Sequence, residues 1–88
     1  MKIRTDVIIQ NKNISIYNAN DFEATYKEKK IIITSNHEFD PPQYNHLTRY
    51  LINVIDIKSG KNEFQKCDDF HTMMDAIRIA VIGSNLIK

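Results

Sequence analysis

The chain has 88 residues, of which 42% are hydrophobic and 26% are charged, and its formal net charge is +1. This length supports one hydrophobic core, so we expect a single compact domain over residues 1–88 without a deep active-site cavity. The near balance of charge indicates no general attraction to nucleic acid or to membranes. No apolar run approaches the roughly 20 residues that cross a bilayer. The single cysteine and the lack of an apolar leader after Met1 predict a cytoplasmic protein.

The first part of the chain alternates between apolar and polar residues, which is typical of half-buried β-strands. Three segments alternate in this way, with polar turns between them: residues 2–9, 13–18 and 22–27. Residues 31–34 are β-branched throughout and apolar on both faces, so we expect a central strand that is covered on both sides. Pro41 and Pro42 then break regular structure within residues 36–45, the longest predicted loop.

The sheet is predicted to end with a hairpin. Residues 46–58 form a long extended segment rich in apolar residues. Ser59 and Gly60 supply a tight turn, and residues 61–66 return as a polar edge strand. The predicted sheet therefore occupies residues 2–66.

A C-terminal helix is predicted over residues 72–87. Thr72 and Asp75 fit the capping-box pattern that begins helices. Apolar residues then recur at helical spacing on one face: Met73, Ala76, Ile77, Ala80, Val81 and Ile87. The predicted fold class is therefore α+β, a mainly antiparallel β-sheet of about five or six strands followed by one C-terminal α-helix packed on one face.

The same helix carries a second apolar stripe, formed by Ile79, Ile82 and Leu86. A helix that lies on a sheet needs one apolar face, so the second stripe has two interpretations that both stay open. Either the loop at residues 36–45 covers it, or it is a contact surface for a partner protein or a second copy of the chain.

The proline-containing loop is the second candidate for a partner-binding surface. Prolines stiffen a loop, which then presents aromatic side chains at low entropic cost. The candidate residues are Phe39, Pro41, Pro42 and Tyr44.

Several side chains could in principle bind a metal ion or act in catalysis. They are His37, Glu38, Asp40, His46, Cys67, Asp68, Asp69 and His71. Their spacing matches no established zinc motif, so they are interpreted as surface residues. Cys67 and His71 could form a nucleophile and base, but the neighbouring carboxylates oppose thiolate formation and no oxyanion donor is evident. The prediction is a protein without enzymatic activity, metal, cofactor or small-molecule substrate.

Nucleic-acid binding is the alternative function. Lysines that could contact phosphates lie in one turn, Lys27, Lys29 and Lys30, and on the hairpin, Lys58, Lys61 and Lys66. Residues 50–80, a hairpin with Gly60-Lys61 at its turn followed by a capped helix, resemble the sheet-plus-helix arm-binding domains of phage integrases. That resemblance implies a DNA-binding hairpin, although Glu63 interrupts its basic residues.

The sequence thus predicts a small non-enzymatic binding protein that acts through protein–protein contacts, with a protein partner or a homodimer as the expected assembly. Its Ile, Asn and Lys content is typical of AT-rich coding, which favours a regulatory or inhibitory factor of a phage or mobile element. A membrane partner is not expected.

Overall fold

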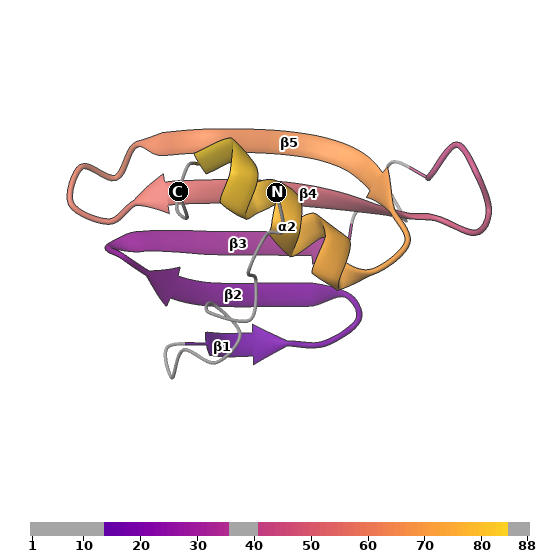
Figure 1. Cartoon of the computed structure of the whole chain (residues 1–88), viewed down its shortest axis with the longest axis horizontal. Helices are drawn as coiled ribbons and strands as arrows, with labels where there is room; N and C mark the ends of the chain where they lie inside the picture. The colour runs from indigo at the N-terminus through magenta and orange to yellow at the C-terminus, as the bar shows by residue number, and fades with distance from the viewer. Residues whose placement is uncertain (1–13, 36–40, 85–88) are drawn as a thin grey trace.

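A computed structural model of the chain describes residues 14–35 and 41–84. These residues form five strands and a helix: β1 (Ile14–Tyr17), β2 (Asp21–Tyr26), β3 (Lys29–Ser35), β4 (Thr48–Asp56), β5 (Asn62–Phe70) and α2 (Met73–Ser84). The strands lie in the order β1-β2-β3-β4-β5 and every neighbouring pair is antiparallel (Figure 1). The predicted α+β class, an antiparallel sheet followed by a C-terminal helix, is confirmed.

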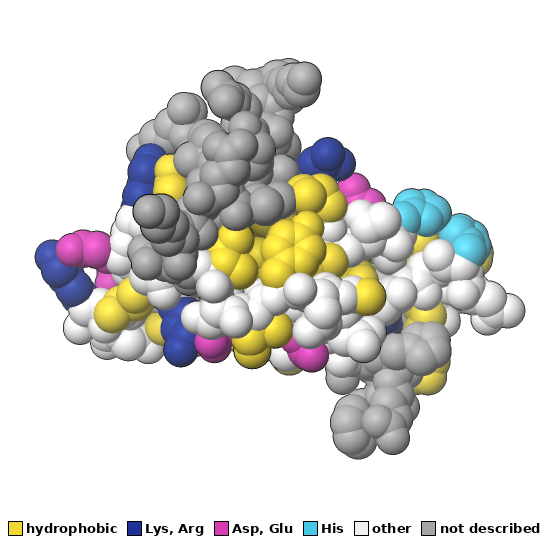
Figure 2. All heavy atoms as spheres, turned by 90° about the horizontal axis from the view of Figure 1, so that it is seen from below, with side chains coloured by type: hydrophobic (Ala, Val, Ile, Leu, Met, Phe, Trp, Pro, Cys, Tyr) yellow, Lys and Arg dark blue, Asp and Glu magenta, His cyan; other side chains and the backbone are white. Residues whose placement is uncertain are grey.

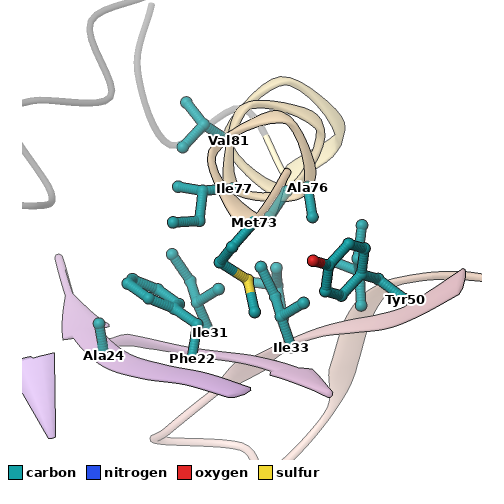
Figure 3. Packing of buried hydrophobic residues seen from close by; sticks show 12 residues of the cluster. Phe22, Ala24, Ile31, Ile33, Tyr50, Met73, Ala76, Ile77 and Val81 are labelled. Atoms are coloured by element: carbon teal, nitrogen blue, oxygen red, sulfur yellow. The ribbon is translucent and has the colours of Figure 1, made fainter. Parts of the chain in front are cut away.

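The core lies between α2 and one face of the sheet. Alternate residues of β2, β3 and β4 point toward the helix and are at most 3% exposed: Phe22, Ala24, Ile31, Ile33, Tyr50, Ile52 and Val54. The helix covers them with the predicted face of Met73, Ala76, Ile77, Ala80 and Val81 (Figure 3). Because the strand period of two and the helical period of 3.6 agree with the observed burial, this part of the prediction is confirmed. Ile87 lies outside the described residues, as does the predicted strand at residues 2–9.

β3 is the central strand, as predicted, but its two faces differ. Ile31 and Ile33 are fully buried beneath α2, whereas Ile32 points to the opposite face and is partly exposed. There it lies between Glu23 of β2 and Asn53 of β4. Within residues 14–35 and 41–84 no helix covers this second face. Around Ile32 it therefore carries both apolar and polar side chains.

The last strand is longer than predicted. β5 continues past Lys66 to Phe70 because β4 offers it partners along its whole length, including Leu51 opposite Cys67 and Arg49 opposite Asp69. Asp69 is therefore a strand residue. Among the described strands β5 lies at an edge of the sheet, as predicted.

The helix begins where its capping box predicts. The Thr72 hydroxyl accepts a hydrogen bond from the Asp75 backbone N–H at 3.3 Å and donates to the Asp75 carboxylate at 3.1 Å. This arrangement satisfies a backbone donor that has no partner within the first turn of a helix. Phe70 packs partly buried against the core just before this start.

Candidate functional site

Most of the lysines proposed for phosphate contact lie beside carboxylates or an aromatic ring. The ion pairs are Lys29 with Glu63 (2.6 Å) and Asp56 (3.3 Å), Lys30 with Glu23 (3.5 Å), Lys58 with Glu28 (3.3 Å) and Lys66 with Asp68 (3.6 Å). Lys27 lies 5.4 Å from the centre of the Tyr26 ring, and Lys61 is exposed at the β4–β5 turn. Because acidic residues alternate with these lysines, the two turns do not present an uninterrupted basic surface.

Three partly buried ion pairs, formed by Lys29 and Arg49, join strands of the sheet. The Lys29 ammonium lies between Glu63 and Asp56, and hydrogen bonding to Glu63 raises the pKa of Lys29 while Lys29 lowers the pKa of Asp56. Arg49 donates to both oxygens of Asp69, at 2.6 and 2.9 Å, and this bidentate contact lowers the pKa of Asp69. These groups hold β3, β4 and β5 together, which is a structural role.

The side chains considered as possible metal ligands are only partly brought together. The His46 and His71 rings lie 5.3 Å apart, centre to centre, whereas Cys67 points to the face of the sheet opposite α2. Among residues 14–35 and 41–84, no three His, Cys, Asp or Glu side chains converge as a metal ion would require. His37, Glu38 and Asp40 lie outside these ranges.

The proline loop lies next to a row of three rings. Tyr44 is 54% exposed, and its ring centre lies 6.0 Å from that of His46, which in turn faces His71. Pro41 is exposed, Pro42 is half-buried, and the Gln43 N–H donates to the Asp69 carboxylate at 3.1 Å. Of the four loop residues proposed as a binding surface, Phe39 lies outside the described part of the chain.

A hollow of about 630 Å³ opens beside these rings. Its walls are residues 17–20, residues 71–74, Thr48 and Tyr50. The Tyr50 hydroxyl donates to the Ala19 carbonyl at 3.0 Å and so ties the β1–β2 turn to the sheet. Viewed from the β1 edge, hydrophobic side chains gather at the middle of the molecule and the two described histidines lie together at one end (Figure 2). The described lining contains no Asp, Glu, Lys or Arg, so the hollow offers ring and hydrogen-bonding groups rather than permanent charge.

The second apolar stripe of α2 borders the flank that faces β5. A methyl group built at Gly83 would overlap the ring of Phe64, so the helix approaches β5 closely at this point. Ile79, one turn earlier on the same flank, is partly buried against the core. Ile82 lies further out and is 50% exposed. Leu86, the third residue of the proposed stripe, is not among the described residues.

β5 forms the outer edge of the sheet beside this flank. Its nine residues are mostly exposed, and no other strand of the described residues lies along its outer side (Figure 1). Phe64, Lys66, Asp68 and Phe70 share the face that carries α2, since they lie opposite Val54, Ile52, Tyr50 and Thr48. We call this region, residues 62–70 together with Ile79 and Ile82, the β5–α2 surface.

No protein-family model, no curated protein and no solved structure matches this chain. Within the described residues, no helix has the length and apolar character needed to cross a membrane.

The close approach of α2 to β5 was not apparent from the sequence. Gly83 is a single glycine near the end of an apolar helix, and its use for packing depends on Phe64, which is 19 positions earlier. The hollow was also missed, because its walls come from three separate segments of the chain. The signal that could have indicated the close approach is a helix-terminal glycine paired with an aromatic residue on the preceding strand.

Proposed function

We propose that this chain is a small non-enzymatic binding protein that acts through contact with another protein chain at the β5–α2 surface. One observation carries this proposal: an edge strand of nine residues runs beside a helix flank on which Ile82 is half exposed. A strand edge offers backbone donors and acceptors in a row, and an adjoining apolar group adds burial when a partner binds.

The charge distribution supports a protein partner over nucleic acid. Binding to phosphates is driven by clustered positive charge that displaces counterions. Four of the six lysines considered for this role form ion pairs with carboxylates instead. A regulatory or inhibitory role inside the cytoplasm, in a phage or mobile element, is the setting that we propose from the composition alone.

The hollow beside Tyr44, His46 and His71 is a second candidate contact surface. Exposed rings next to a pocket of hydrogen-bonding groups are suited to anchoring a side chain of a partner protein. The 54% exposure of Tyr44 favours this role. Pro41 and Pro42 precede these rings and restrict the backbone that carries them.

A site-specific photo-crosslinking experiment tests the proposal. A photoreactive amino acid replaces Ile82 in one variant and Lys58, an exposed residue of the β4–β5 turn, in a matched control. Both variants are irradiated in extract from cells that produce the protein, and the products are identified by mass spectrometry. We expect protein crosslinks from position 82 that are absent from position 58. Crosslinks to nucleic acid, or equal products from both positions, would contradict the proposal.

A further inference from the structure

We infer that His46 and His71 bind a zinc ion at the end of the sheet where α2 begins. The two histidines are not part of the β5–α2 surface, so this inference goes beyond the proposed function and does not depend on it. Both side chains are exposed and they lie next to each other on the surface (Figure 2). An ion can therefore reach them directly from solution.

The register of β4 and β5 brings the two histidines together, although a whole hairpin separates them in the chain. Thr48, the first residue of β4, is paired with Phe70, the last residue of β5. His46 precedes this pair and His71 follows it, so both lie at the same end of the sheet. Their spacing along the chain matches no zinc motif, which is why the sequence predicted no metal.

Local structure on each side restricts the backbone that carries the two rings. In the loop before β4, the Leu47 N–H donates to the Tyr44 carbonyl at 3.1 Å, and His46 lies within this turn. His71 lies between the end of β5 and the helix-capping residue Thr72. Ligands that are already in place lose little conformational entropy when an ion binds.

The separation of the rings matches two imidazoles on one tetrahedral ion. Zn²⁺ binds an imidazole nitrogen at about 2.0–2.1 Å, and the ring centre lies roughly 1.2 Å further along the same line. Two rings at the tetrahedral angle then have centres about 5.2 Å apart. The ring centres of His46 and His71 are 5.3 Å apart. The right angle of a square-planar ion would give about 4.5 Å, so the observed separation favours Zn²⁺ over Cu²⁺.

The surroundings of the pair are compatible with a cation in an open site. Arg49 and Arg78, the arginines nearest in sequence to the two histidines, are paired with Asp69 and Asp75. Structural zinc sites have four protein ligands and catalytic sites have three, and the part of the chain that the structure describes holds no such group. With two histidines, water fills the remaining positions, so the inferred site exchanges its ion with solution.

Calorimetric titration with zinc chloride tests the inference on the untagged full chain. We expect the wild type to bind one Zn²⁺ per chain. His46→Phe and His71→Phe keep a ring at each position but remove its nitrogens. Each should weaken binding roughly tenfold or more, because the second ligand of a pair binds at a high effective concentration. His37→Phe changes the third histidine of the chain and is the matched control, which should bind Zn²⁺ as the wild type does.

NMR signals of the three histidine rings locate the ion. Zn²⁺ should shift the signals of His46 and His71 and leave the third in place, and circular dichroism checks that each variant is folded. A wild type that binds no Zn²⁺, or phenylalanine variants of the pair that bind it as tightly as the wild type, would overturn the inference. A loss of binding in His37→Phe as large as that in His46→Phe would also overturn it, because the pair would then not be the site by itself.

Discussion

At the scale of single residues, a left-handed turn and a bidentate ion pair could not be predicted from the sequence. Lys27 and Glu28 form the two-residue turn between β2 and β3 with φ angles of 50° and 63°. Left-handed backbone is costly for residues with a Cβ atom, and turns of this type favour Asn and Gly. At the other end of the sheet, Arg49 and Asp69 form a bidentate pair. Both sites allow predictions about stability.

Glu28→Gly should stabilise the protein. The substitution relieves left-handed strain of roughly 1–2 kcal/mol and loses only the exposed pair with Lys58, worth about 0–1 kcal/mol. We expect a net gain of about 1 kcal/mol and a melting temperature about 4–8 °C higher by calorimetry. Glu28→Ala is the matched control, since it loses the same ion pair but keeps a Cβ atom. If Ala stabilised the protein as much as Gly, the explanation from backbone strain would be wrong.

Asp69→Asn should change how stability depends on pH. The Arg49 contact lowers the pKa of Asp69 below its ordinary value of 3.8, so the folded state favours the carboxylate and the unfolded state takes up the proton first. The resulting stabilisation is present above pH 4 and is lost as the pH falls through the folded-state pKa. We expect urea unfolding to show the variant as less stable than the wild type at pH 7, with a difference that shrinks toward pH 2. A difference that stayed constant with pH would contradict this assignment.

At the scale of elements, two sides of α2 pack against different parts of the sheet. One side fills the core with Met73, Ile77 and Val81 (Figure 3), and the other approaches β5 through Gly83. Since the helix is 12 residues long, it depends on this packing rather than on its own propensity.

Gly83→Ala should destabilise the protein although alanine is the better helix former by about 1 kcal/mol. The added methyl group overlaps the Phe64 ring, and overpacking of this kind costs about 1–3 kcal/mol. Adding Phe64→Leu should recover part of the loss, which a double-mutant cycle by urea unfolding would measure. An increase in stability for Gly83→Ala alone would show that the helix and β5 separate at little cost.

Ile77→Ala and Ile82→Ala should differ strongly in their effect on stability. Ile77 is fully buried, so its truncation should cost about 2–5 kcal/mol. Ile82 is 50% exposed, and its truncation should cost less than about 1 kcal/mol. Equal losses in denaturant unfolding would mean that Ile82 belongs to the core rather than to a contact surface.

At the scale of the whole molecule, the sequence predicted what depends on local pattern and missed what depends on pairing between distant segments. Alternation located the strands, and Thr72 with Asp75 located the helix start. The continuation of β5 to Phe70 depends on partners supplied by β4. The contact between Lys29 and Glu63 could not be predicted from sequence, because the two residues are 34 positions apart.

The candidate surface was predictable in part for the same reason. Ile79 and Ile82 were identified by helical spacing, but the approach of this part of α2 to β5 follows only from the direction in which the helix crosses the sheet. Lys66 and Asp68 form an ion pair because both residues lie on one face of β5. The hypothesis of a protein partner or homodimer therefore preceded the structure, while the approach of α2 to β5 could not be predicted.

Size-exclusion chromatography with light scattering, run at low and high salt with absorbance at 260 and 280 nm, tests the central claim most directly. The chain has four Tyr and no Trp, so bound nucleic acid would dominate its absorbance. We predict a mass of about 21 kDa, twice the 10.3 kDa of one chain, at both salt concentrations and without excess absorbance at 260 nm. A 10.3 kDa species that carries material absorbing at 260 nm and releases it at high salt would contradict a function through protein contact.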